Sequence, residues 1–221
     1  DLHLNVTSNM CPPDKKLKEK YFNMAQEICM QEKVEHMMQF VSVDAFGKRA
    51  EYIRDGLDFD YMMDNVEEFL DRIPVRNSIT FICTYNNLSI TSMDKLLSKV
   101  LELRQRYSKT YQRVWFDVPL LRQPAWQQIT LLPESYQIIH EDNIKYMQAN
   151  SGEANGLHIF KDFEIQKMQR NLAYWRENAD ASTQNKKNFY AFFNEHDRRR
   201  LTRFLNTFPE MEEFWEDCKN A

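Results

Sequence analysis

In Gln39-Phe40-Val41-Ser42-Val43-Asp44-Ala45-Phe46-Gly47, an apolar, β-branched run ends in a small hydroxyl and a carboxylate and then breaks at glycine. A helix-forming segment, Ala50-Glu51-Tyr52-Ile53-Arg54, follows. This order is typical of a buried strand that carries polar groups at its carboxyl end and is followed by a helix. Since α/β folds bind their ligands at the carboxyl ends of strands, we expect a binding site at this point of the chain.

The same order of strand, polar tip and amphipathic helix recurs through the first part of the chain. Strands are predicted at residues 2–6, 34–43, 78–83 and 111–118, with polar tips at Thr7-Ser8-Asn9, Ser42 and Asp44, Thr84-Tyr85-Asn86-Asn87, and Asp117. Four alternations favour parallel strands with right-handed crossovers, covering helices and strand tips on one rim. Because four strands are too few to close an eight-stranded barrel, we expect an α/β partial barrel or open sheet that further N-terminal strands would complete.

After Leu132-Pro133 the pattern becomes purely helical. Helices are predicted around residues 141–147, 162–178, 188–204 and 210–219, with loops at 150–156 and 178–185. Aromatic residues in this tail supply enough apolar area to dock it on the first part. The predicted organisation is therefore a partial β/α barrel at residues 1–133 and a helical C-terminal extension at residues 134–221.

The composition of the chain restricts the classes of partner that we expect for this protein. The net charge of −4 and the pI near 5.8 give no electrostatic footprint for nucleic acid or an anionic membrane. No apolar run approaches the roughly 18 residues of a membrane span, and no secretion signal opens the chain, so we expect a cytoplasmic protein. The chain begins with Asp1 and alternates like a strand from Leu2, which favours the C-terminal part of a longer protein.

The cysteines do not predict a metal site. Cys11, Cys29, Cys83 and Cys218 lie far apart, without the spacing that holds zinc or an iron–sulfur cluster from one loop. Free and mostly buried thiols are expected.

The strongest candidate site is Ser42-x-Asp44, with Arg54 twelve positions after the serine. A hydroxyl and a carboxylate at a strand tip can bind a sugar diol, and a guanidinium can bind a carboxylate through two hydrogen bonds. Such a set suits a nucleoside that carries an amino-acid moiety. The alternative is that Ser42 and Asp44 cap the next helix and that Arg54 forms a surface ion pair.

Two further patterns have a structural and a functional interpretation. Asp58-Phe59-Asp60 has the spacing by which sugar-nucleotide transferases hold a divalent ion, although acids before a helix are commonly caps. Glu195-His196-Asp197, followed by Arg198-Arg199-Arg200, is compatible with an anion site or an acid–base pair but is also typical of a helix face with salt bridges.

Three segments together resemble the middle of a radical S-adenosylmethionine enzyme of the peptide- and protein-modifying branch: residues 42–47, 51–60 and 65–70. The shared features are the Ser-x-Asp strand tip, the arginine twelve residues later, the Gly56-Leu57-Asp58-Phe59-Asp60 turn and the Asn65-Val66 pair. The resemblance covers residues 1–120, which correspond to the third to sixth strands of that family's six-stranded partial barrel. Ala45 departs from it, because the family has glycine there; Gly47 is the candidate to take over the turn.

The resemblance implies site residues. Ser42 and Asp44 would face the ribose and methionine end of S-adenosylmethionine, and Arg54 would bind its carboxylate. Thr7 and Asn9 would also lie on the cofactor side. Thr84, Asn86 and Asp117 would face the substrate.

The resemblance also implies an oxidoreductase that uses a deoxyadenosyl radical to abstract hydrogen from an unidentified substrate, with a peptide or protein as the candidate. The cysteine loop for the [4Fe-4S] cluster and the Gly-Gly-Glu strand tip would precede Asp1, so this chain alone would be inactive. Two other functions stay open: a non-catalytic α/β binding module, and a metal-dependent glycosyltransferase that uses Asp58 and Asp60.

Overall fold

A computed structural model describes residues 2–152 and 156–221 of the chain. Four strands form one parallel sheet in the order β1-β2-β3-β4, with bounds His3–Ser8 (β1), His36–Ser42 (β2), Ser78–Ile82 (β3) and Val114–Asp117 (β4). The prediction of an α/β fold with four parallel strands is confirmed, and the strand ends differ from the predicted ones by at most three residues.

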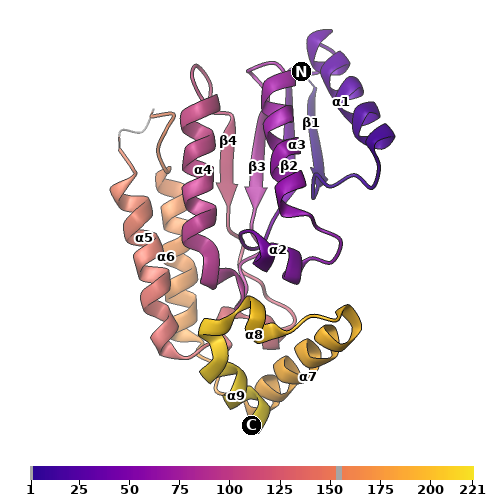
Figure 1. Ribbon diagram of the computed structural model, residues 1–221. Helices are drawn as coiled ribbons and strands as arrows, with labels where there is room; N and C mark the ends of the chain where they lie inside the picture. Colours follow the sequence, from indigo (N-terminus) through magenta and orange to yellow (C-terminus); the bar gives the residue numbers. More distant parts are fainter. Residues whose placement is uncertain (1, 153–155) are drawn as a thin grey trace.

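Helices α1 (Lys15–Met30), α3 (Phe59–Arg72) and α4 (Met93–Tyr107) cover one face of the sheet. The short α2 (Lys48–Ile53) lies beyond the carboxyl ends of the strands (Figure 1). Figure 1 shows α3 and α4 in front of the strands. Asp14 and Asp58 cap α1 and α3, since their carboxylates accept hydrogen bonds from the amides of Leu17 and Tyr61, at 2.7 and 3.0 Å.

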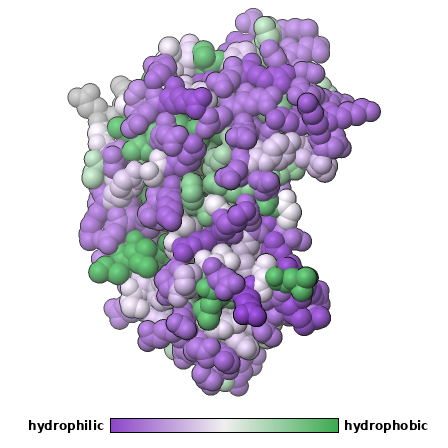
Figure 2. Space-filling view, in the orientation of Figure 1, coloured by the Kyte–Doolittle hydropathy of each residue, from purple (hydrophilic) through white to green (hydrophobic). Residues whose placement is uncertain are grey.

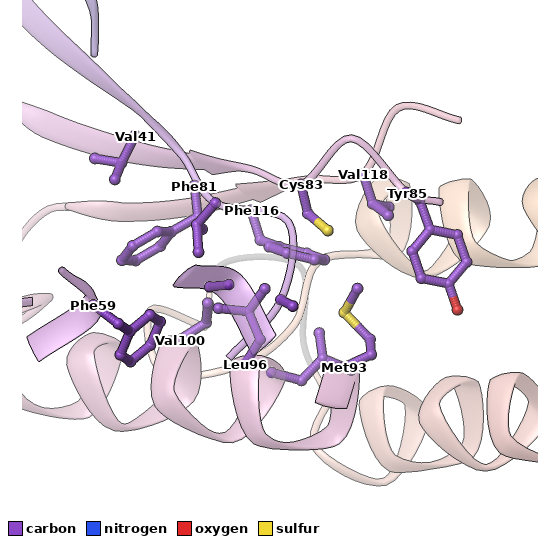
Figure 3. Packing of buried hydrophobic residues seen from close by; sticks show 14 of the residues in the cluster. Val41, Phe59, Phe81, Cys83, Tyr85, Met93, Leu96, Val100, Phe116 and Val118 are labelled. Carbon is purple, nitrogen blue, oxygen red and sulfur yellow. The ribbon is translucent and has the colours of Figure 1, made fainter. Parts of the chain in front are cut away.

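The core lies between the sheet and these helices. Val41, Phe81 and Phe116 occupy one register row across β2, β3 and β4, and all three are at most 1% exposed. Figure 3 shows this row directed toward Leu96 and Val100 of α4. Burial of each such side chain contributes roughly 1.5–3 kcal/mol, so this row fixes the register of the sheet.

The opposite face of the sheet is largely open. Asn5 and Thr7 of β1 are exposed on it, and Phe40, Ser42 and Trp115 are only half-buried. Parallel sheets are normally covered on both faces. An open face on a parallel sheet is therefore available for a ligand or a further part of a protein.

A buried ion pair closes the sheet at β4. Arg104 of α4 and Glu164 of the tail are both fully buried, with their charged atoms 2.5 Å apart. Arg104 Nε donates to the carbonyl of Val114 at 3.0 Å, and the amide of Phe116 donates to Glu164 at 3.1 Å. Side chains thus satisfy the outer backbone groups of β4 that a fifth strand would otherwise pair with.

The tail consists of α5 (Gln137–Ala149), α6 (Asp162–Glu177), α7 (Thr183–Arg200), α8 (Phe204–Thr207) and α9 (Glu212–Asn220). Single 3₁₀ turns occur, in the whole described chain, at Ser89–Ser92, Ala125–Gln127, Ile129–Leu131, Glu134–Tyr136 and Pro209–Met211.

Of the loop predicted at 150–156, residues 153–155 lie outside the described part. Within the described ranges no helix is long and apolar enough to cross a membrane.

The predicted bounds of the helix around residues 188–204 are wrong at both ends. It begins at Thr183, because the Ser182 hydroxyl accepts a hydrogen bond from the amide of Asn185 at 3.2 Å. It ends at Arg200, because Leu201 adopts a left-handed conformation with φ 54°. Phe204 then begins the separate helix α8 and stacks on Trp215 at a ring-centroid distance of 4.5 Å.

We expect Glu164→Gln to lower the free energy of unfolding by about 3–5 kcal/mol, because it leaves the buried Arg104 charge uncompensated. Denaturant titration measures this loss. Glu195→Gln is the matched control, since Glu195 pairs with arginines on the surface and its loss should cost less than about 1 kcal/mol. A loss below about 1 kcal/mol for Glu164→Gln would contradict the role given to the pair.

We also expect stability to fall as the pH is lowered from about 6.5 to 4. Burial lowers the pKa of His140 to about 4, while its Nδ1 lies 2.6 Å from the Tyr85 hydroxyl and its Nε2 lies 2.8 Å from the Met168 carbonyl. In that pH window the unfolded chain binds a proton that the folded chain does not, which removes about 3 kcal/mol in total. Unfolding titrations across the window should show a shallower pH slope for His140→Gln than for the wild type; equal slopes would refute this assignment.

Candidate functional site

Asp44 joins the carboxyl ends of β2 and β3. It lies two residues beyond β2, is 6% exposed, and its Oδ1 accepts a hydrogen bond from the amide of Thr84 at 2.9 Å. Asp44 does not cap α2, since that helix begins after Gly47 without a side-chain cap. Gly47 has φ 61°, a backbone conformation that favours glycine. The turn before α2 is therefore made at Gly47, as expected from the presence of alanine at position 45.

Arg54, directly after α2, lies against the same carboxylate. Its Nε is 2.7 Å from Asp44 Oδ2, and the two side chains are 31% and 8% exposed. The Nε–H is not directed at this oxygen, so the contact is an ion pair without a hydrogen bond. In the described part of the chain the two terminal nitrogens of Arg54 make no hydrogen bond, which leaves them available to an anionic ligand.

Ser42 and Asp117 lie on the open face at the same level. Both are in register with Ile82, so they are two strands apart, roughly 10 Å at ordinary strand spacing. Asp117 forms an ion pair with Lys167 of α6, which the sequence did not suggest. Ser42 is the last residue of β2, two positions before Asp44, and its side chain is half-buried.

Of the other predicted site residues, only Thr84 contacts Asp44 in the described structure, and it does so through its backbone. Asn9 accepts a hydrogen bond from the amide of Cys11 at 3.1 Å, and Asn86 accepts one from the amide of Leu88 at 2.9 Å, so both amide side chains hold local turns. Thr7 is exposed and in register with Phe40, which places it two residues below the level of Ser42. Thr84 contributes its backbone amide to Asp44.

The two acids of the Asp-x-Asp pattern, Asp58 and Asp60, lie at the start of α3, where they stabilise the helix. Asp58 caps α3, and Asp60 lies in the first turn of that helix, where a negative charge is favourable. In residues 2–152 and 156–221 no three His, Cys, Asp or Glu side chains are grouped so that they could hold a metal ion.

Residues of the C-terminal extension contact the segment between Asp44 and Arg54, which the sequence analysis missed. Arg200 donates to the carbonyls of Tyr52 and Glu51 at 2.7 and 3.0 Å, and the Tyr52 hydroxyl donates to Asp197 at 2.8 Å. The predicted salt bridges are confirmed only for Glu195, which pairs with Arg198 and Arg199 on the exposed side of α7. No local signal in the sequence indicates the other contacts, because their partners are about 145 residues apart.

These contacts have electrostatic effects. Burial raises the pKa of Tyr52, and its hydrogen bond to Asp197 raises it further. Burial and the neighbouring Arg200 lower the pKa of His196. The Tyr52 phenol and the His196 imidazole are thus favoured in their neutral forms.

A cavity of about 560 Å³ lies between α2 and the tail. Its walls include Lys48, Arg49, Lys95 and Arg200. Arg49 forms an ion pair with Glu210 at 2.8 Å, and Arg200 lies 3.1 Å from Asp55, so both guanidinium groups already have partners. Figure 2 shows that the visible face of the molecule is predominantly hydrophilic.

The sequence matches no protein-family model, and searches of the curated proteins and of the solved structures also found no similar protein.

We expect Asp44→Ala to destabilise the protein more than Asp44→Asn. Alanine leaves the Thr84 amide without its partner and costs about 1–3 kcal/mol, whereas the asparagine oxygen can still accept this hydrogen bond. Denaturant unfolding of both variants gives the comparison. Equal losses would mean that the hydrogen bond between the strand ends contributes nothing, and that only the charge of Asp44 matters.

Proposed function

We propose that this chain is the C-terminal part of a radical S-adenosylmethionine enzyme. The single observation that carries the proposal is the position of Arg54, whose two terminal nitrogens have no partner in the described part of the chain and lie beside Asp44 at the carboxyl end of β2. This strand tip belongs to the segment whose residues resemble that family. The sheet of four parallel strands is consistent with part of a partial barrel.

The residues at this rim fit the cofactor. Arg54 can keep Nε against Asp44 and offer its terminal nitrogens to the carboxylate of the methionine moiety. In the described part of the chain each carboxylate oxygen of Asp44 has one polar partner, and a carboxylate oxygen can accept more than one hydrogen bond, so a ribose hydroxyl can donate to it. Ser42 adds a hydroxyl on the open side of the sheet.

Arg54, Asp44 and Ser42 would hold S-adenosylmethionine, whose one-electron reduction by a [4Fe-4S] cluster would release methionine and provide a deoxyadenosyl radical for hydrogen abstraction from the substrate. The residues of this chain bind and orient the cofactor. Its open sheet face leaves room for a substrate, for which a peptide or protein is our candidate, and Trp115 and Phe163 provide aromatic surface there with ring centroids 6.2 Å apart.

The outer edge of β1 supports the proposal that further strands precede this chain in the sheet. Leu2 accepts a hydrogen bond from the amide of Glu35, so in a parallel ladder the backbone groups of His3, Asn5 and Thr7 point away from β2. Edge strands in soluble proteins are usually protected by charged residues or proline. The sequence of β1, HLNVTS, has no Lys, Arg, Asp, Glu or Pro, so a preceding strand is its best partner. The proposal places the cluster ligands in that preceding part.

The proposal is tested first by the coding sequence upstream of Asp1. We expect a Cys-x-x-x-Cys-x-x-Cys motif there, with a Gly-Gly-Glu segment between it and Asp1. A coding sequence without the cysteine motif would refute the proposed function.

We further expect Arg54→Ala, in the cluster-loaded full-length protein, to weaken S-adenosylmethionine binding by about tenfold to a hundredfold, because a charge-assisted hydrogen bond contributes about 1.5–3 kcal/mol. Calorimetry gives the affinity. Arg198→Ala serves as control, since Arg198 is exposed and pairs only with Glu195 in the described part. Unchanged affinity in Arg54→Ala would remove Arg54 from the cofactor site.

A non-catalytic binding module is the second candidate. It is favoured by the internal pairing of Asp44 with Arg54, which satisfies most of the site without a ligand. Under this hypothesis the upstream sequence lacks the cysteine motif, and the full-length protein does not bind S-adenosylmethionine.

A further inference from the structure

The segment that carries Arg54 cannot hold its own conformation. Helix α2 has six residues, and its N-cap Gly47 makes no side-chain cap. Helices this short are unstable in water unless tertiary contacts hold them. Arg54 is the C-cap of α2, with its amide donating to the carbonyl of Ala50 at 2.9 Å, so the end of α2 sets the position of this arginine.

Arg200 binds that end of the helix. Its two terminal nitrogens donate to the carbonyls of Tyr52 and Glu51, and its Nε lies 3.1 Å from a carboxylate oxygen of Asp55. A cation at a helix C-terminus also interacts favourably with the helix dipole. One side chain of the tail therefore contacts residues on both sides of Arg54.

Tyr52 provides the second attachment. It is 3% exposed, donates its hydroxyl to Asp197 at 2.8 Å, and packs against Phe208 and His196 at ring-centroid distances of 5.3 and 4.4 Å. Asp197 in turn accepts hydrogen bonds from the Thr202 hydroxyl and the Phe204 amide, at 2.7 and 2.6 Å. Tyr52 is thereby fixed to the turn between α7 and α8.

Two further contacts hold α2 through the side chains of Glu51 and Arg49 and do not involve the carbonyl groups at its C-terminal end. Glu51 accepts a hydrogen bond from the amide of Phe59 at 3.2 Å, and Arg49 forms its ion pair with Glu210. Among the described residues, the last-turn carbonyls of Glu51 and Tyr52 receive side-chain hydrogen bonds from α7 alone.

From this geometry we infer that Arg200 is a positioning residue that holds Arg54 against Asp44, and that the C-terminal extension is thus an integral part of the rim site. The identity of the ligand rests on the proposed function, whereas the positioning of Arg54 concerns the described residues only.

The experiment compares Arg200→Gln, Arg200→Lys and the control Arg198→Gln. Arg200→Gln removes the charge and most donors, Arg200→Lys keeps the charge, and Arg198 lies on the same helix without contacting α2. For each variant we measure the free energy of unfolding, the NMR signal of the Arg54 Nε–H group, and the affinity of the cluster-loaded full-length protein for S-adenosylmethionine. Arg54→Lys assigns the NMR signal.

We expect Arg200→Gln to shift or broaden the Arg54 signal and to weaken binding tenfold or more. Arg200→Lys should restore part of both effects, and Arg198→Gln should change neither. If Arg200→Gln does not fold, Tyr52→Phe, which removes only the hydroxyl that binds Asp197, replaces it with the same expected direction. A folded variant with an unchanged Arg54 signal would overturn the inference. Absence of binding in the wild type would instead refute the proposed function, while the NMR comparison would still decide whether Arg200 positions Arg54.

Discussion

The buried ion pair between Arg104 and Glu164 is the constraint on which the arrangement of the molecule depends. Neither charge is exposed, so each must be compensated by the other and by backbone hydrogen bonds. The pair meets this requirement at the outer edge of β4, where it binds Val114 and Phe116. The same contacts attach α6 to the sheet, and Glu164 also accepts a hydrogen bond from the Lys161 amide at the start of that helix, at 2.9 Å.

The sheet is consequently asymmetric. At β4 its edge is occupied by side chains of α4 and α6, whereas at β1 the outer backbone groups have no partner in the described part of the chain. One face is filled by the row of Val41, Phe81 and Phe116, and the other is only partly covered, by contacts of α6 with Trp115 and Asp117. Among the described residues, β1 is thus the edge strand whose outer backbone groups remain open to a further strand. A largely open inner face and strand tips on one rim are the features that a partial barrel would use for a ligand.

The rim site depends on parts that are distant in the chain. Asp44 is held by the amide of Thr84, Arg54 is held by its ion pair with Asp44, and the helix between these two residues is held by Arg200 and Asp197. The helical extension thus contributes to the rim by holding α2 in place, and its α6 pairs with Asp117 through Lys167. These contacts explain how a short helix without a side-chain cap keeps its place between Asp44 and Arg54.

The sequence by itself determined the α/β fold class, the four strands, the position of Ser42 and Asp44 at a strand tip and, as one of two interpretations, helix capping by the acids of Asp58-Phe59-Asp60. These features follow from local patterns, because hydrophobic periodicity, capping residues and turn residues act over a few positions. It did not determine that Asp44 binds Thr84, that Asn9 and Asn86 hold turns, or that Asp117 pairs with Lys167. Only the tertiary structure decided these partners and the attachment of α7 to α2, since each depends on which of many similar polar groups the packed core brings within hydrogen-bond distance.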